Sequence, residues 1–217
     1  AEKKQEILEI SNVKDRGYKI LDDIVAEMEI ASLEKTIESF KTKSSKNIEF
    51  VLEREKVING LEKEIIDYLV PLSDKNLSDD EQHKVFVMMY AINDYERIGD
   101  HCENIIELIQ EIKEENSVFS KTAFDEYEKI SSDVMKIIVD TTNAYKDNNL
   151  ELAKKCIPIE EEVDILEETY RRNHMDRINK GICDTNAGVK FLDILSNFER
   201  IADHCLNIAN YTLGKEL

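Results

Sequence analysis

An internal repeat limits the possible folds of this chain more than any other feature of its sequence. Residues 93–105 read NDYERIGDHCENI, and residues 196–208 read SNFERIADHCLNI. Eight of these thirteen positions are identical after a shift of 103 residues. Similarity of this kind at a fixed period indicates that one structural unit occurs twice along the chain.

A fainter similarity precedes each copy of this stretch. Residues 55–62 read EKVINGLE and residues 160–167 read EEEVDILE, which corresponds to a shift of 105 residues. Because the two shifts are nearly equal, we predict two copies of one unit, which span residues 1–116 and 117–217.

Both copies favour helix throughout. Apolar residues recur at helical spacing, and only 6 glycines and 2 prolines interrupt the 217 residues. We predict an all-α fold of two pseudo-symmetric three-helix bundles, one in each copy. The six predicted helices run over about 7–40, 51–69, 78–115, 120–146, 150–180 and 184–213. A capping box at residues 78–81 starts the third helix, Pro71 ends the second and Gly181 ends the fifth.

Charge and cysteine content exclude several classes of protein. The formal net charge of −18 repels a phosphate backbone, so we expect no nucleic acid partner. The four cysteines lack zinc-ligand spacing, and we expect reduced thiols in a cytoplasmic protein. The sequence has no run of 18 apolar residues, and its first twenty residues are too charged for a signal peptide.

Two acids in each copy lie near the apolar stripe of the third helix of the bundle. On a helical wheel, Glu96 lies about 40° and Asp100 about 80° from the centre of the core-facing stripe. Glu199 and Asp203 take the same places in the second copy. The recurring element is therefore a Glu-x-x-x-Asp pair that leans towards the core.

The preceding helix carries a similar pair in each copy. Glu55 and Asn59 correspond to Glu160 and Asp164 after the shift of 105. Two helices of each bundle thus present acids along their packing seam. Unpaired buried charges cost several kcal/mol, so we expect a compensating positive charge.

A bound cation is the compensation that we favour. Arg97 and Arg200 follow the acids directly, but each lies about 100° around the helix from the adjacent glutamate, so we expect each to face another helix. Several carboxylates without an inward Cys or His favour a hard or intermediate metal, namely iron, manganese, magnesium or calcium, with zinc as an alternative.

The acids differ between the copies at two positions. Asn59 stands where the second copy has Asp164, which leaves the first site with one charge fewer. We therefore predict weaker metal affinity in the first copy. Glu103 also has no acidic counterpart, because Leu206 stands at that position.

These residues resemble the PhoU family of phosphate-uptake regulators, whose signature is a repeated Glu/Asp-x-x-x-Asp pattern on two pseudo-symmetric three-helix bundles. The resemblance spans nearly the whole chain, and it implies a multinuclear metal cluster with iron favoured and zinc or nickel as alternatives. The implied metal ligands are Glu55, Asn59, Glu96, Asp100, Glu160, Asp164, Glu199 and Asp203.

The resemblance also implies a partner. Residues 187–210 look like the cytoplasmic PhoU-like tail of bacterial sodium/phosphate cotransporters, and the absence of an initiator Met agrees with an excised tail. This implies a regulatory domain on the cytoplasmic face of the inner membrane, with its own upstream membrane domain as partner. The alternative is a free-standing PhoU protein that acts on a phosphate ABC transporter and its sensor kinase. A homodimer is open in both cases.

We expect a non-enzymatic protein. A carboxylate-bridged di-iron oxidase is the competing class, and it typically requires Glu-x-x-His, which none of the four histidines provides. A metal-free helical adaptor for a basic partner is a third reading. His101 and His204 lie about 140° around the helix from the motif glutamates, which favours capping or surface roles, whereas His174 falls on an apolar stripe and is predicted to be a core residue.

Overall fold

The computed structural model describes residues 23–73, 75 and 77–215. These residues form six helices and no strand, which confirms the all-α prediction. Residues 7–22 of the first predicted helix lie outside the described residues. The helices span residues 23–42, α2 (Ser45–Ser73), α3 (Asp79–Glu114), α4 (Lys121–Asp147), α5 (Leu150–Asn179) and α6 (Thr185–Thr212).

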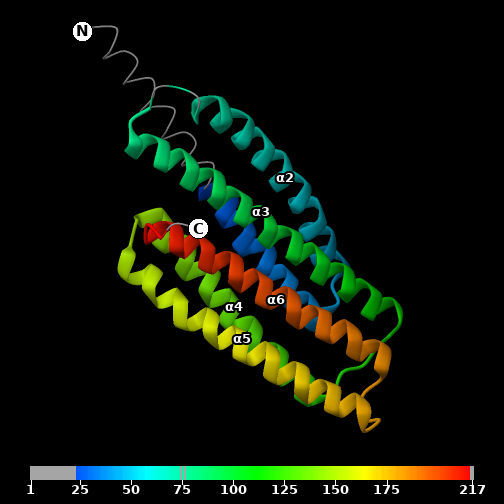
Figure 1. The fold of residues 1–217 in the computed structure, drawn as a ribbon. Coiled ribbons are helices and arrows are strands. Elements are labelled where there is room, and N and C mark those ends of the chain that lie inside the picture. Colours follow the sequence, from blue (N-terminus) through cyan, green and yellow to red (C-terminus); the bar gives the residue numbers. More distant parts are fainter. Residues whose placement is uncertain (1–22, 74, 76, 216–217) are drawn as a thin grey trace, which may run out of the picture.

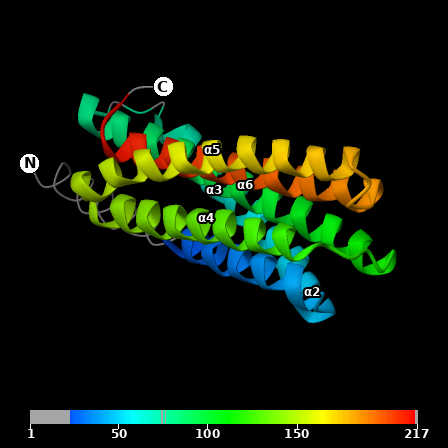
Figure 2. The ribbon, with the colours of Figure 1, turned by 90° about the horizontal axis from the view of Figure 1, so that it is seen from below.

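The helices form two bundles that pack against each other through their last helices. α3 and α6 lie side by side at the middle of the molecule, with α2 beside α3 and α5 beside α6 (Figure 1). The first helix, over residues 23–42, and α4 lie together on one face of this row (Figure 2). Each repeat supplies three consecutive helices, so the prediction of two pseudo-symmetric three-helix bundles is confirmed.

The connection between the first two helices is the same in both repeats. Residues 43–44 separate the first helix from α2, and residues 148–149 separate α4 from α5. Lys43 and Asn148 both have a φ of 49°, in the left-handed region. The shift of 105 residues therefore extends from α2 and α5 back through this turn into the preceding helices, and it identifies which of their residues correspond.

The predicted helix ends are confirmed at two positions and wrong at one. Ser78 caps α3 through a capping box with Glu81. Gly181, with a φ of 67°, ends α5, and its N–H donates to the carbonyl of Ile178 at 2.9 Å. Pro71, in contrast, lies inside α2, which continues to Ser73. Near a C-terminus, proline disturbs only the last turn, so the helix does not need to stop there.

An aromatic contact joins the first helix of each repeat. The Phe40 ring stacks on the Tyr127 ring with centroids 3.9 Å apart, and the Tyr127 hydroxyl donates to the carbonyl of Ile37 at 3.3 Å. All four cysteines are free, as predicted, and three of them are buried. Within the described part of the chain, no helix is long and apolar enough to cross a membrane.

Candidate metal centres

The first repeat brings three carboxylates together between α2 and α3. Oxygens of Glu55, Asp100 and Glu103 all lie within 4.8 Å of one another, and we call these residues the first acidic cluster. Glu55 is buried, whereas Asp100 and Glu103 are half-buried. Asn59 lies beside this cluster and donates a hydrogen bond from its amide to Oε1 of Glu55.

The second repeat forms an equivalent group between α5 and α6. Oxygens of Glu160, Asp164 and Asp203 lie within 4.8 Å of one another, and these residues are the second acidic cluster. Three of the eight predicted ligands therefore converge here, and two converge in the first acidic cluster. Both groups lie on the seams predicted from the helical wheels.

The two clusters contain the same number of acids, but at different positions of the repeat. The first acidic cluster has the neutral Asn59 but gains Glu103, and the second has Asp164 but Leu206 in place of Glu103. The expectation of a weaker first site depended on the charge lost at Asn59. Glu103 supplies a third carboxylate to the first acidic cluster, so both clusters hold three acids, and the order of their metal affinities stays a prediction.

Burial and neighbouring carboxylates raise the pKa of several acids in these clusters. Burial, followed by the charges of Asp164 and Asp203, raises the pKa of Glu160 to about 7. Burial and the charge of Asp100 raise the pKa of Glu55, and burial and the charge of Asp203 raise that of Asp164. Each cluster is thus a place where negative charge accumulates without enough compensation from the protein.

The remaining motif glutamates, Glu96 and Glu199, lie at the edges of the clusters. Burial and the neighbouring aspartate, Asp100 or Asp203, raise the pKa of each. They are therefore close enough to feel the cluster charge, but they do not belong to the groups that converge within 4.8 Å.

The two motif arginines pair with the aspartates of their own motif, which the helical wheels did not predict. Arg97 lies 3.4 Å from Asp100, and Arg200 lies 3.9 Å from Asp203. The long arginine side chain folds back along its own helix to the residue three positions on, although its Cβ points elsewhere. Both arginines are about 60% exposed, at 61% and 62%, so they offset the cluster charge only weakly.

One acid near the first acidic cluster was missed by the sequence analysis. Glu29, on the first helix, is fully buried, and neither of its carboxylate oxygens has a hydrogen-bond partner within the described residues. Burial and the charges of Asp100 and Glu55 hold its pKa well above the usual range. Glu29 lies four residues after Val25 and four residues before Leu33, and both of these are buried. This position on the apolar stripe of the first helix is the sequence signal that could have identified it.

The histidines at the end of each motif have a structural role. The rings of His101 and His204 stack on each other across α3 and α6, with centroids 5.6 Å apart. Nδ1 of His101 lies 2.9 Å from Oδ1 of Asn197. The predicted capping or surface role is therefore wrong, because packing of the two repeats places these rings in an interface. His174 is buried, as predicted.

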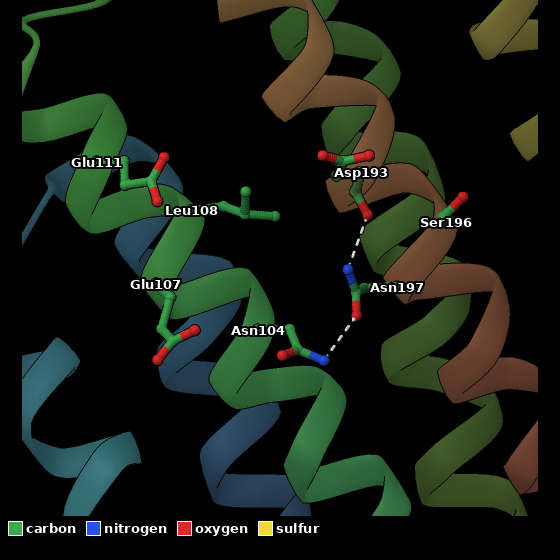
Figure 3. A pocket seen from close by; sticks show the side chains of 7 residues that line it. All are labelled: Asn104, Glu107, Leu108, Glu111, Asp193, Ser196 and Asn197. Atoms are coloured by element: carbon green, nitrogen blue, oxygen red, sulfur yellow. Dashed lines mark hydrogen bonds between the residues drawn. The ribbon is translucent and has the colours of Figure 1, made fainter.

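A groove between α3 and α6 lies outside both clusters. Figure 3 shows Asn197 bridging it, with its amide donating to the carbonyl of Asp193 at 2.8 Å and Asn104 donating to its Oδ1 at 3.4 Å. Glu107 and Glu111 lie on the α3 side. The groove contains none of the eight predicted ligands, and its acids are spread along the helices.

Comparison with protein families resolves the identity of the repeat. The model of the PhoU domain matches residues 23–109 and again residues 127–212. The chain belongs to the PhoU family. The two PhoU domain matches fall on either side of the predicted boundary at residues 116 and 117, and that boundary itself stays a prediction.

Two curated relatives support this membership. The chain is 26% identical over 179 residues to "Phosphate-specific transport system accessory protein PhoU homolog 1" of Thermotoga maritima, covering 82% of this chain and 76% of that protein. It is 21% identical over 179 residues to the PhoU homolog of Clostridium acetobutylicum, covering 82% of this chain and 80% of that protein. Neither name mentions a cotransporter.

Solved PhoU structures have the same fold. PhoU from Pseudomonas aeruginosa superimposes with a TM-score of 0.88 at 20% identity, covering 93% of this chain and 96% of that chain. The regulatory protein PhoU from Streptococcus pneumoniae gives 0.83 at 17% identity, covering 93% and 94%. At this identity, the likeness establishes the fold.

A third match is local. A Lon protease of Fusobacterium nucleatum is 77% identical over 47 residues, which are 22% of this chain and 6% of that protein. The chain thus spans far less than two thirds of the protease, and the activity of the protease is not transferred to this PhoU-family chain.

The acids of both repeats fit a metal ion of the kind that the family resemblance implies. Each cluster supplies three oxygen ligands within 4.8 Å of one another, and neither cluster contains a cysteine or a histidine. Ligand sets of oxygen alone suit manganese, magnesium and calcium, and carboxylates also bind iron in helix bundles. The buried carboxyl group of Glu29, near the first acidic cluster, has no hydrogen-bond partner among the described residues.

Proposed function

We propose that this chain is a non-enzymatic, metal-binding regulator of phosphate transport that acts as a free-standing PhoU protein on a phosphate transporter, and on a sensor kinase linked to it, in the cytoplasm. Membership of the PhoU family supports the regulatory part. The two curated relatives, both named as accessory proteins of phosphate transport, favour this reading over the tail of a cotransporter. A homodimer is compatible with the proposal.

The duplicated carboxylate clusters are the observation that carries the metal part. The first and second acidic clusters would each bind iron, with zinc or nickel as alternatives, through Glu55, Asp100 and Glu103 or through Glu160, Asp164 and Asp203. A bound cation supplies positive charge. The residues themselves link α2 to α3 and α5 to α6, so a neutralised cluster would hold each helix pair together.

Elemental analysis of the purified chain tests the metal part. We expect Asp100→Asn and Asp203→Asn each to remove the metal of one cluster, and the double variant to remove nearly all of it. Asp193→Asn is the matched control, because Asp193 is an exposed acid on α6 outside both clusters. Equal metal content in the wild-type chain, the two single cluster variants and their double variant would contradict metal binding at the clusters.

Thermal unfolding separates this proposal from a metal-free adaptor. A chelator should lower the melting temperature of the wild-type chain, because a cation bound to the folded state alone stabilises that state. The adaptor reading instead predicts the same melting temperature with and without chelator.

Phosphate uptake in cells tests the regulatory part. In a host that lacks this gene, uptake of labelled phosphate should no longer fall when phosphate is plentiful. The wild-type chain should restore that response, and the Asp100→Asn, Asp203→Asn double variant should not. A gene deletion that leaves the response intact would contradict a regulatory role.

A further inference from the structure

Glu29 is the buried charge that the two-helix clusters do not explain. It comes from the first helix, whereas the predicted ligands of this repeat lie on α2 and α3. Its side chain is 0% exposed, and both of its oxygens lack a hydrogen-bond partner among the described residues. A carboxylate in such a place costs several kcal/mol unless a cation or a proton neutralises it.

The backbone of α3 makes room for this side chain. A Cβ placed on Gly99 would lie 2.5 Å from Oε1 of Glu29, so any larger residue here requires the Glu29 side chain to move. Gly99 directly precedes Asp100 of the first acidic cluster. The Glu29 carboxylate therefore lies against the turn of α3 that presents Asp100, and it is more deeply buried than Asp100 and Glu103. Its oxygens are not among those that converge within 4.8 Å in the first acidic cluster.

Nearby positive charge does not satisfy Glu29. Among the described residues, the cation that lowers its pKa is Arg54, whose guanidinium lies over the Phe50 ring, 4.5 Å from the centroid. None of the ion pairs formed within the described ranges involves Glu29. The acids Glu55, Asp100 and Glu96 instead add negative charge around it.

The second repeat has neither the acid nor the glycine. The shift of 105 residues, which the matching turns at residues 43–44 and 148–149 extend into the first helix, places Val134 opposite Glu29. The shift of 103 places Ala202 opposite Gly99. Val134 and Ala202 are both fully buried. The acid and the glycine thus occur together in one repeat and are replaced together in the other.

We propose that Glu29 is an additional metal ligand on the buried side of the first acidic cluster, and that the first repeat therefore binds a divalent cation more tightly than the second. This inference rests on the proposed metal sites. This order of metal affinities is the reverse of the one expected from Asn59, which predicted weaker binding in the first repeat. It also places a ligand on a third helix, so that a cation would join the first helix to α2 and α3.

Titration with Fe²⁺ under anaerobic conditions tests this inference in the full chain. Asp203→Asn disables the second acidic cluster, so calorimetry then reports on the first repeat alone. In that background, Glu29→Gln should weaken Fe²⁺ binding by at least roughly 10-fold, as removal of groups that support a metal site typically does. Glu34→Gln, which removes an exposed acid from the same helix, is the matched control and should leave the affinity unchanged.

A second variant separates the loss of a metal ligand from a general loss of folding. Glu29→Val combined with Gly99→Ala introduces the pair that the second repeat already uses. It should weaken Fe²⁺ binding as Glu29→Gln does, while the melting temperature of the metal-free chain rises because an unsatisfied buried carboxylate is gone.

The outcomes separate this inference from the proposed function. Fe²⁺ affinity that is unchanged in both Glu29 variants would overturn the role of Glu29 and leave the two acidic clusters as metal sites. Absence of Fe²⁺ binding in the parent and in the wild-type chain would overturn the metal sites themselves, and the role of Glu29 with them.

Discussion

Nδ1 of His204 on α6 lies 2.7 Å from Oδ1 of Asp94 on α3. The same aspartate accepts hydrogen bonds from the Tyr211 hydroxyl at 2.6 Å and from the Asn207 amide at 3.2 Å. At the equivalent place in the other repeat, Asn197 stands opposite His101. The two repeats are therefore joined by a nearly symmetric pair of contacts, of which only one contains an acid.

Replacing this acid should weaken the contact between the repeats. We expect Asp94→Asn to lower the free energy of unfolding by about 1–3 kcal/mol, because an amide cannot accept on both of its polar atoms and leaves a buried donor unsatisfied. Urea denaturation measures the loss. Asp193→Asn, at an exposed position of α6, provides the baseline, and a loss no greater than this baseline would contradict a structural role for Asp94.

A buried ion pair joins α4 to α5 in the second repeat. Nη1 of Arg177 donates to Oε1 of Glu126 at 3.0 Å, and the side chains are only 14% and 7% exposed. We expect Arg177→Met to lower the free energy of unfolding by about 3–5 kcal/mol, because it leaves the Glu126 charge buried and unpaired. Chemical denaturation measures this loss.

The controls for this prediction use two further variants. Adding Glu126→Met should recover much of the loss, since the buried charge is then removed as well. Arg172→Met breaks an exposed pair with Glu168 and should cost at most about 1 kcal/mol. A similar loss from both arginine substitutions would show that burial of the pair has no effect.

The raised pKa of Glu160 predicts a pH-dependent stability. An unfolded glutamate loses its proton near 4.5, whereas folded Glu160 holds its proton up to about pH 7. Between these values the folded state binds more protons than the unfolded state, so the contribution of Glu160 to stability falls as pH rises. The second acidic cluster should thus destabilise the metal-free chain at neutral and higher pH.

Comparison of Glu160→Gln with the wild-type chain isolates this effect. Near pH 8, the variant should melt roughly 2–4 °C higher without metal, which corresponds to about 1 kcal/mol for a chain of this size. Near pH 4, where both states hold the proton, the difference should vanish. Thermal unfolding of chelator-treated protein measures it, and a difference that is constant with pH would refute the assignment.

Much of the fold could be predicted from the sequence because its strongest signals are local or repeated. The capping box at Ser78, the glycine at 181 and the duplicated motifs all act within a few residues of chain. The convergence of Glu55 with Asp100 and of Glu160 with Asp203 also followed, because two apolar stripes that face each other carry their flanking acids with them.

The errors arose where tertiary packing or side-chain length decides the outcome. A helical wheel gives the direction of a Cβ atom, so it placed Arg97 away from Asp100, although the long side chain returns to it. Only the packing of α3 on α6 shows that His101 meets His204. Glu29 has no counterpart in the second repeat, so a search for repeated acids could not identify it.

The contact between Gly99 and Glu29 allows a test that does not depend on metal. Gly99→Ala should lower the free energy of unfolding by about 1–3 kcal/mol, because its Cβ would lie 2.5 Å from Oε1 of Glu29 and force that buried side chain to move. Gly60→Ala is the control, since a Cβ there has no neighbour within 4 Å, and it should stabilise α2 by roughly 0.5–1 kcal/mol.

Addition of Glu29→Val to Gly99→Ala should reverse the loss, because valine leaves the space that alanine then fills, as Val134 and Ala202 do in the second repeat. Urea denaturation of the wild type, the two single variants and the double variant gives a double-mutant cycle. Residues in contact should couple by about 0.5–3 kcal/mol. Additive effects would mean that Gly99 is not needed to accommodate Glu29, and the joint replacement of the two residues between the repeats would then have another cause.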